Sequence, residues 1–201
     1  MDWQAHYETG DTPWDEGAPH PALLDFIAAS GPFHGRILVP GCGRGHDVRA
    51  ISTQSNAVIG LDLAHGAIAH AESFPKSGCE RYMAGDLFNL PAELRSSFDW
   101  VVEHTCFCAI DPAMRPVYAA SVADALRPGG HLFAIFYLDP AADHQPPYGV
   151  ALAELDRLFS PHFELIRQWT PARTFEGRES RELIRILRPK PVATGRWPMQ
   201  E

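Results

Sequence analysis

The sequence predicts a three-layer α/β domain, with one mostly parallel sheet, helices on both of its faces and an antiparallel hairpin at one edge. Three observations predict this fold. Short runs rich in β-branched and aromatic residues alternate with stretches of helix-forming composition. A glycine-rich turn, PGCGRG, directly follows the first of these runs. The last two apolar runs have no crossover helix between them, so we expect them to pair with each other.

The expected strands are short apolar runs that end at turn residues. Those before the proline-rich stretch DPAADHQPPYG cover residues 36–39, 57–62, 79–86, 98–104 and 129–137. Between them, composition predicts helices at 46–54, 64–73 and 112–126, the last with Asp111 as N-cap and Pro112 in the first turn. Beyond the proline-rich stretch we expect a helix near 151–159 and strands at 162–170 and 179–189.

Composition and charge indicate one domain at residues 1–189, followed by a flexible tail at 190–201. The 201 residues are 45% hydrophobic and include eleven Phe and five Trp, which is enough for one substantial core. The formal net charge is −8 and the basic residues are scattered, which argues against a nucleic-acid partner. The longest apolar run, LFAIFYL at 132–138, is too short to cross a bilayer, so we expect no membrane partner.

The cysteines and the N-terminal segment indicate a cytoplasmic protein. Four cysteines lack the density of a secreted disulfide framework. The first thirty residues contain no apolar block of the kind that an ordinary secretory signal needs. We therefore expect free thiols in a reducing compartment and a small-molecule substrate as the partner, while the sequence leaves the oligomeric state open.

The glycine-rich turn predicts the class of ligand. In open α/β sheets, ligands bind where the strands end, and the first strand–helix turn gives the closest backbone approach. Gly41, Gly43 and Gly45 form the pattern G-x-G-x-G, which is associated with S-adenosylmethionine. The dinucleotide fingerprint G-x-G-x-x-G needs glycine where His46 stands. An NAD-dependent oxidoreductase therefore stays an alternative, and the less favoured one.

Two carboxylates extend the expected cofactor site. Asp62 ends the second expected strand, where its oxygens can accept hydrogen bonds from both ribose hydroxyls. Asp86 ends the third, where it can contact the adenine amino group while Leu87 packs against the ring. We also assign Leu63, which follows Asp62, to the cofactor site. The ordered series of glycines and strand-terminal aspartates is more specific than any of its parts.

Several motifs carry a family resemblance: GDTPWDEGAPHPAL, LVPGCGRGHDV, VIGLDLAHGAIAHA, EHTCFCAIDPAMRPVYA and PPYGVALAEL. Together they resemble the thiopurine S-methyltransferase superfamily, most closely its thiol, thiocyanate and halide methyltransferase branch, from about Trp3 to residue 160. The resemblance implies a Rossmann-like class I methyltransferase fold with a seven-stranded sheet. It also implies S-adenosylmethionine as methyl donor, S-adenosylhomocysteine as its product, and a small soft nucleophile, chiefly sulfur, as acceptor.

The resemblance assigns residues 1–20 to the covering of the cofactor. Trp3, Tyr7 and Trp14 are then aromatic side chains that fold over it, and aromatic faces attract the sulfonium cation of the donor. Packing of Trp14 on the body of the domain is the simpler alternative. Glu103 is implied to lie where the ammonium group of the cofactor and the acceptor meet.

Tyr137 and His104 are the implied catalytic residues. Tyr137 matches the tyrosine that lines the acceptor pocket in plant halide and thiocyanate enzymes. His104 stands where thiopurine-methylating members carry arginine, which argues against a thiopurine acceptor. Either side chain would lower the cost of ionising a thiol. A partly exposed histidine without a chemical role is the alternative for His104.

Four further side chains could belong to the acceptor pocket. Phe107 and Tyr148 are expected to wall it or to serve ordinary packing. Arg173 and Arg178 flank the turn FEG, where surface solvation is a simpler explanation than contact with an anionic acceptor.

A metal site and a loss of catalysis are the remaining alternatives. His104, Cys106 and Cys108 would share one face if the fourth strand continued through them. Zinc sites usually need a C-x-x-C spacing and a fourth ligand, so we predict no metal and two small buried thiols. A binding protein that keeps the cofactor pocket without turnover also remains open.

Overall fold

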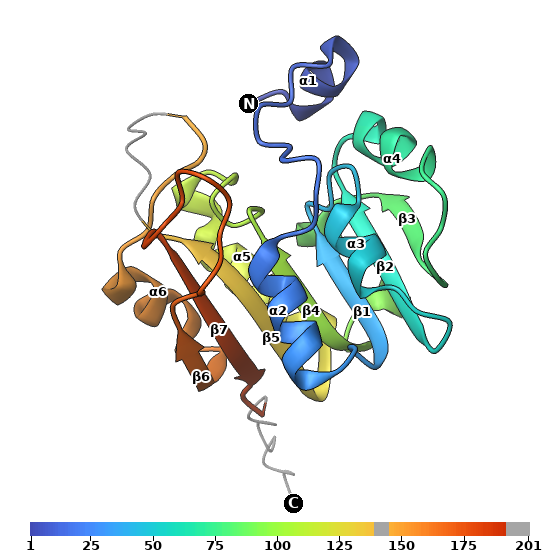
Figure 1. Ribbon diagram of the computed structural model, residues 1–201. Coiled ribbons are helices and arrows are strands. Elements are labelled where there is room, and N and C mark those ends of the chain that lie inside the picture. Colours follow the sequence, from blue (N-terminus) through green and yellow to red (C-terminus); the bar gives the residue numbers. More distant parts are fainter. Residues whose placement is uncertain (139–144, 192–201) are drawn as a thin grey trace, which may run out of the picture.

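The computed structural model describes residues 1–138 and 145–191, and its centre is a seven-stranded sheet (Figure 1). The strand order is β3-β2-β1-β4-β5-β7-β6. β1 to β5 run parallel, β7 pairs antiparallel with β5, and β6 pairs antiparallel with β7. The strands are β1 Gly35–Pro40, β2 Asn56–Asp62, β3 Arg81–Ala84, β4 Phe98–His104, β5 Leu126–Tyr137, β6 Phe163–Trp169 and β7 Glu182–Pro189. The predicted parallel sheet and edge hairpin are confirmed.

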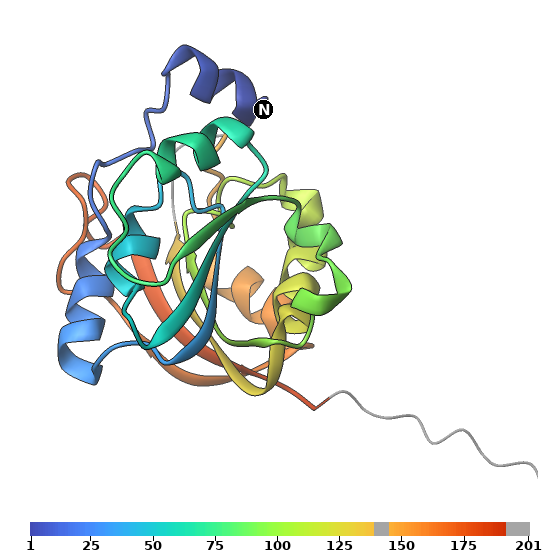
Figure 2. The same ribbon diagram turned by 90° about the vertical axis from the view of Figure 1, so that its right-hand side faces the viewer.

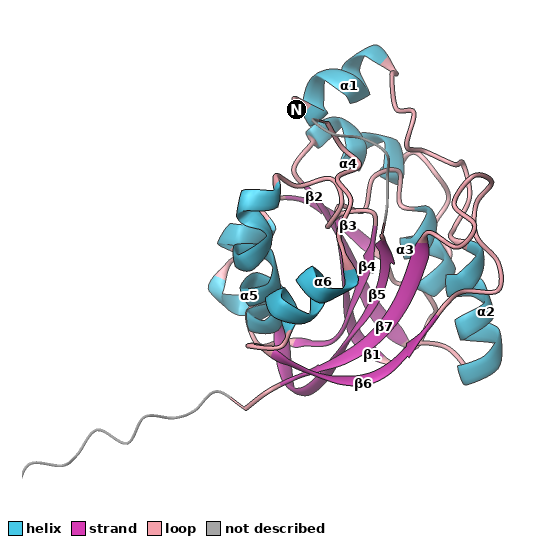
Figure 3. Cartoon of the chain, turned by 90° about the vertical axis from the view of Figure 1, so that its left-hand side faces the viewer, coloured by secondary structure: helices cyan, strands magenta, loops and turns pink. Residues whose placement is uncertain are grey.

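Helices cover both faces of the sheet and one of its ends. Figure 3 shows α2 and α3 on one face and α5 and α6 on the other, which completes the predicted three layers. α1 and α4 lie at the end of the sheet where the parallel strands finish (Figure 1). The helices are α1 Trp3–Thr9, α2 Pro21–Ser30, α3 His46–Ile51, α4 His65–Glu72, α5 Arg115–Ala125 and α6 Leu152–Phe159; short 3-10 turns lie at Leu87–Asn89, Ala92–Leu94 and Pro112–Met114.

The apolar core forms two clusters, one on each face of the sheet. Tyr118 of α5 and Phe159 of α6 pack with Phe136 of β5 on one face. Val48 of α3 packs with Ile37 of β1 on the opposite face. The central strands are buried on both faces, as their near-continuous apolar runs indicate. In the parallel register Pro40 of β1 lies beside Leu61 of β2, so the ends of these strands meet at one edge of the sheet.

Local capping explains where two helices begin. The side chain of Asp111 accepts a hydrogen bond from the amide of Ala113 at 2.9 Å, as predicted, although a 3-10 turn there precedes α5. α2 was not predicted. It begins at Pro21, and the ring of His20 accepts from the amide of Ala22 at 3.1 Å. A histidine cap followed by proline is a weaker sequence signal than the aspartate cap.

The other differences lie at element boundaries and in the N-terminal segment. α3 ends at Ile51 rather than at residue 54, and β3 covers only Arg81–Ala84 of the expected 79–86. β5 begins at Leu126, directly after α5, three residues before the expected start. α1 was not predicted either, because one face of this short helix carries Trp3 and Tyr7, residues that sequence analysis assigned to a ligand.

The N-terminal segment crosses the end of the sheet and forms a roof, residues 1–18, over the strand ends. Figure 2 shows α1 above the sheet and beside α4. None of the helices within the described residues is long and apolar enough to span a membrane. The predicted tail at 190–201 falls, from residue 192 onward, outside the described residues.

Candidate active site

A cavity of about 620 Å³ lies between the roof and the carboxyl ends of the parallel strands. Such an edge is where open α/β sheets bind their ligands. The structure brings all predicted site residues except Gly45 and Glu103 to its wall: Trp3, Tyr7, Trp14, Gly41, Gly43, Asp62, Leu63, Asp86, Leu87, His104 and Tyr137. The predicted donor and acceptor residues therefore share one cavity.

The glycine-rich turn is packed tightly by the protein itself. A Cβ on Gly41 would lie 2.9 Å from the Cβ of Cys106, and one on Gly45 would lie 2.6 Å from the ring of Tyr82. Both glycines also have positive φ angles, of 60° and 73°, which other residues rarely adopt. Gly41 lines the cavity, whereas Gly45 lies behind it as the N-cap of α3. The third glycine of the motif therefore serves packing rather than the cavity wall.

Asp62 is fixed by the backbone on both sides of its carboxylate. One oxygen accepts from the amide of Gly43 at 2.9 Å and the other from the amide of Ala64 at 3.0 Å. Burial raises the pKa of Asp62, and the hydrogen bonds from backbone amides act against that rise. Each carboxylate oxygen has a second lone pair, so both can still accept a hydroxyl group from the cavity. Asp86 is similarly placed, since its side chain accepts from the amide of Phe88 at 2.8 Å.

The roof presents its aromatic residues to the cavity and to α4. Tyr7 packs with Ala64 and Ala67, and Trp14 contacts Trp3 edge-to-face with a ring separation of 5.1 Å. Trp14 thus both packs on the molecule and lines the cavity, so the two readings of this residue are compatible.

One side chain ties the roof to the glycine-rich turn. The carboxylate of Asp15 pairs with Arg44 at 3.0 Å and with His46 at 3.1 Å. Arg44 lies in the turn and His46 begins α3, so the roof is anchored to the segment that forms the cavity floor.

Glu103 is not on the cavity wall in this structure. It is 1% exposed, and its carboxylate accepts hydrogen bonds from the amide of Phe107 at 2.9 Å and from the hydroxyl of Tyr118. Burial raises its pKa to about 7, although these hydrogen bonds act against the rise. Its neighbours give it a structural role between β4 and α5, and contact with the cofactor stays a prediction.

A cluster that sequence analysis missed surrounds His104. Nδ1 of His104 lies 2.7 Å from one carboxylate oxygen of Asp47, and the other oxygen accepts from the amide of His20 at 2.8 Å. Nε2 of His20 lies 2.8 Å from Glu182. The rings of His20 and His104 meet edge-to-face with a separation of 4.6 Å. Asp47 had a sequence signal, as a carboxylate in the first turn of the helix after the glycines, whereas His20 and Glu182 had none.

His20, His104 and Glu182 have the residue types of a metal site, but their hydrogen bonds do not suit one. One ligand atom from each lies within 4.8 Å of the others. Nδ1 of His20, however, accepts the amide hydrogen of Ala22, so the ring proton is at Nε2 and is donated to Glu182. Metal binding at Nε2 would move this proton to Nδ1, against the Ala22 amide. The cluster is therefore two hydrogen-bonded pairs.

The cysteine residues do not extend this cluster. β4 ends at His104 and Thr105 has a φ of 62°, so the alternation that would place Cys106 and Cys108 on the face of His104 stops there. Both thiols lie close to the cavity, and burial raises the pKa of each, to about 12 for Cys108. Cys108 is a small buried thiol, as predicted, whereas Cys106 is only half-buried.

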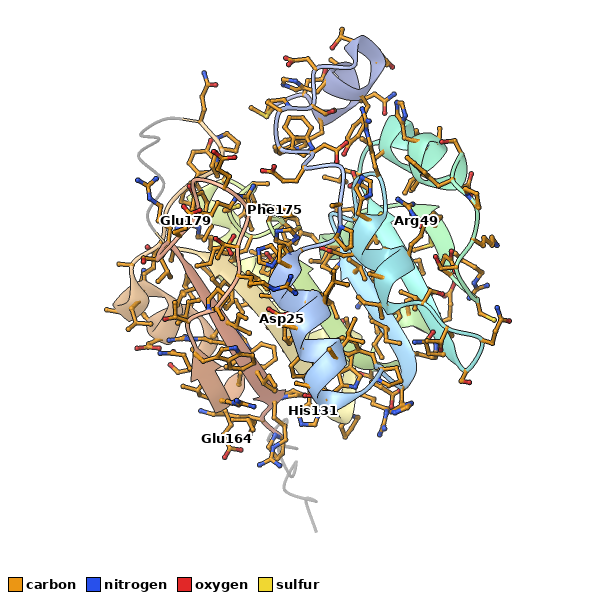
Figure 4. The ribbon with its side chains drawn as sticks, in the orientation of Figure 1. Asp25, Arg49, His131, Glu164, Phe175 and Glu179 are labelled. Carbon is orange, nitrogen blue, oxygen red and sulfur yellow. The ribbon has the colours of Figure 1, made fainter. Side chains whose placement is uncertain are left out.

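The two arginines of the FEG turn have opposite surroundings. Arg178 lines the cavity with a side chain only 14% exposed, and its guanidinium lies 5.4 Å from the centre of the Tyr137 ring and 5.6 Å from that of Phe175. Surface solvation was the wrong explanation for Arg178. The side chain of Arg173 is 59% exposed and pairs with Asp25 on α2, so surface solvation is the correct explanation for Arg173. Figure 4 shows Phe175 at the upper end of the sheet and Asp25 lower, on α2.

The two other expected pocket residues, Phe107 and Tyr148, do not line the cavity. Phe107 is 2% exposed and packs against Tyr118, Phe136 and Phe159. Tyr148 is held by its backbone, since its amide donates to the carbonyl of Cys108 at 2.7 Å. Neither is on the cavity wall, while the preceding residues of the PPY motif, Pro146 and Pro147, are.

Comparison with known proteins identifies relatives over most of the chain. The model of the family Thiopurine S-methyltransferase (TPMT) matches residues 1–186. Thiocyanate methyltransferase 1 of Brassica oleracea is 38% identical over 166 residues, which cover 79% of this chain and 71% of that protein. Probable thiol methyltransferase 2 of Arabidopsis thaliana is 33% identical over 164 residues, with the same coverage of both chains.

Solved structures share the fold at lower identity. The structure of Burkholderia thailandensis 1,6-didemethyltoxoflavin-N1-methyltransferase, with its substrate and S-adenosylhomocysteine bound, superposes with a TM-score of 0.70 at 22% identity. The match covers 92% of this chain and 84% of that one. The Rossmann-like methyltransferase fold expected from the sequence is thereby confirmed.

Proposed function

This chain belongs to the thiopurine S-methyltransferase family, and on that premise we propose that it transfers a methyl group from S-adenosylmethionine to a small soft nucleophile: a thiol, thiocyanate or a halide. One observation carries the proposal. The glycine-rich turn and Asp62 share a cavity with His104, Tyr137 and Arg178, which supports a donor site next to an acceptor site. S-adenosylhomocysteine is then the second product.

The residues present fit this cofactor. Gly41 and Gly43 leave bare backbone at the cavity wall, and Asp62 retains two lone pairs for the ribose hydroxyls. Asp86, Leu63 and Leu87 line the part of the wall assigned to the adenine. Trp3, Tyr7 and Trp14 supply the aromatic cover that suits a sulfonium cation.

The protein contributes to the reaction by alignment and desolvation. When bound, S-adenosylmethionine supplies a methyl group on a positively charged sulfur, which a nucleophile takes by in-line displacement. The roof and strand ends enclose the reactants and exclude water, which strengthens electrostatic interactions inside the cavity. Arg178 lines the cavity, where its guanidinium pairs with Glu16 at 3.4 Å and with Glu182 at 3.6 Å, and it can also offer positive charge to an anionic acceptor. Tyr137, whose ring lies 5.4 Å from the guanidinium of Arg178, lines the same cavity.

Cofactor identity is tested by a thermal-shift comparison. At a hundredfold excess over its dissociation constant a ligand stabilises the folded state by about 2.7 kcal/mol. We expect S-adenosylhomocysteine to raise the midpoint of unfolding and NAD to leave it unchanged. The reverse result would favour the oxidoreductase.

Turnover is tested by an acceptor panel that contains iodide, thiocyanate and small thiols. Mass spectrometry is expected to detect a gain of one methyl group in at least one of them, together with S-adenosylhomocysteine. A bound cofactor without any methylated product would identify a binding protein that has lost catalysis.

We also propose a domain extent, a cellular compartment and a class of partner for this methyltransferase. Residues 1–189 act as one methyltransferase domain in the cytoplasm, where four free cysteines stay reduced. Its partner is a small molecule rather than nucleic acid, in keeping with a net charge of −8.

A further inference from the structure

Asp47 lies at the centre of the cluster around His104. It is in the first turn of α3, and its two oxygens take hydrogen bonds from two different segments of the chain, Nδ1 of His104 and the amide of His20. Burial would raise the pKa of Asp47, but the contacts with His104 and the hydrogen bond from the backbone amide of His20 outweigh it and leave that pKa below its ordinary value. The carboxylate is therefore ionised, and it only accepts hydrogen bonds.

An ionised Asp47 determines the tautomer of His104. Because the carboxylate can only accept, Nδ1 of His104 must carry the proton at the 2.7 Å contact. Nε2 then has a free lone pair when the ring is neutral. This Nε2 is buried and has no hydrogen-bond partner among the described residues, while His104 itself lines the cavity. A buried nitrogen without a hydrogen-bond partner destabilises the folded state, so its presence here calls for an explanation such as a catalytic role.

We propose that Asp47 is a positioning residue that holds His104 in the tautomer able to take a proton from a neutral thiol acceptor. The inference rests on the proposed methyl transfer and adds the group that removes the proton. The thiol gives its S–H proton to Nε2 of His104 as its sulfur forms the new S–CH3 bond. The bond between the methyl group and the sulfonium breaks, and its electron pair stays on the donor sulfur. The proton on His104 is afterwards released to water.

Other groups around His104 support this direction of proton transfer. The ring of His20, from the segment before α2, faces His104. Glu103 precedes His104 on β4. Glu182, the first residue of β7, lies near both histidines and pairs with Arg178. Burial lowers the pKa of His20, so that ring stays neutral and donates its proton to Glu182. Among these groups, His104 is the imidazole that lines the cavity, and its Nε2 has no hydrogen-bond partner in the described part of the chain.

The test compares an acceptor that carries a proton with one that does not. Wild type, Asp47→Asn and His104→Gln are assayed near pH 7 with 2-mercaptoethanol and with iodide, each against S-adenosylhomocysteine formation. Iodide needs no base, so it serves as the internal reference. We expect the thiol-to-iodide rate ratio to fall at least tenfold in both variants, and the loss to shrink once the pH ionises the thiol itself.

Two controls and a spectroscopic measurement make the test specific. Asp25→Asn removes a carboxylate from an exposed ion pair with Arg173, away from the cavity, and it should leave the rate ratio unchanged. Adding Asp47→Asn to His104→Gln should lower the ratio no further, because the two residues act as a unit. Imidazole nitrogen NMR of the cofactor-free protein should show the Nδ1–H form of His104 in wild type and its loss in Asp47→Asn.

Equal losses with thiol and iodide, or an Nε2–H tautomer in wild type, would overturn the inference. If wild type methylates no member of the acceptor panel, the proposed function fails instead, and the tautomer seen by NMR then decides whether Asp47 positions His104.

Discussion

The two halves of the cavity are built in different ways. The half that we propose binds the donor contains the glycine-rich turn and strand-terminal aspartates, and backbone amides fix it: Gly43 and Ala64 hold Asp62, and Phe88 holds Asp86. The acceptor half consists of side chains held by other side chains, brought together from before α2, from α3, β4 and the turn before β7. Local backbone geometry specifies the first half, and tertiary contacts specify the second.

This difference indicates which half of the cavity can change its ligand preference while the fold stays the same. A turn that binds a ligand through its backbone, as we propose here, tolerates few substitutions. A set of side chains can be altered one residue at a time, and acceptor preference changes with it. The predictions below test the contrast, from the largest expected effect to the smallest.

Asp62→Ala should remove most of the donor affinity. Two charge-assisted hydrogen bonds contribute about 1.5 to 3 kcal/mol each, so we expect S-adenosylhomocysteine binding to weaken at least a hundredfold. Isothermal titration calorimetry measures this directly. Asp25→Ala, on the exposed face of α2, is the control for loss of a carboxylate. Unaltered affinity in Asp62→Ala would break the assignment of the donor half.

Glu103→Gln should change how stability depends on pH. Burial raises the pKa of Glu103 from its ordinary 4.5 to about 7, so the folded state binds more protons than the unfolded chain between these values. The free energy of unfolding therefore falls as the pH rises through this window, by about 3 kcal/mol at most. Glutamine cannot ionise, so the variant should gain that amount relative to wild type between about pH 5 and pH 8.

Urea unfolding of both proteins at the two pH values gives the difference. Parallel pH dependence would show that the carboxyl group is not desolvated as the structure has it. Calorimetry with S-adenosylhomocysteine on the same variant decides whether Glu103 belongs to the donor half or only supports β4 and α5.

Arg178→Met should weaken anionic acceptors. A hydrogen bond to a charged group contributes about 1.5 to 3 kcal/mol, so we expect KM for thiocyanate to rise roughly ten- to a hundredfold, with a smaller change in kcat. Arg173→Met, on the same turn but 59% exposed, is the matched control, and its KM should stay within about twofold of wild type. Similar effects in the two variants would mean that the turn, rather than the buried cation, matters.

Tyr137→Phe should have the smallest effect. It removes one hydroxyl and keeps the ring that Arg178 covers, so we expect turnover to fall roughly three- to tenfold, as for loss of one hydrogen bond. Steady-state kinetics with thiocyanate measure the change. A loss as large as that of Asp62→Ala would contradict the view that the acceptor half is built from separable contributions.

The contrast also explains what the sequence could predict. The strands, their direction and the donor residues followed from local patterns: apolar runs, glycine spacing, and an aspartate at each of two strand ends. His20 and Glu182 are 162 positions apart, yet their side chains are 2.8 Å apart, and no local pattern encodes such a contact. Arg178 and Arg173 have the same chemistry in the sequence, and only the fold decides which one is buried. Gly45 matches the cofactor motif, but the structure requires glycine there because a Cβ would collide with Tyr82.

The packing of the glycine-rich turn has a consequence for laboratory evolution of this enzyme. Gly41 meets Cys106 after β4, Gly43 meets Tyr7 of α1, and Gly45 meets Tyr82 of β3. A library that randomises the turn alone therefore collides with three separate elements and yields mostly misfolded clones. Productive diversity lies in the side chains opposite the turn, where new acceptors can be selected while the donor cradle stays intact.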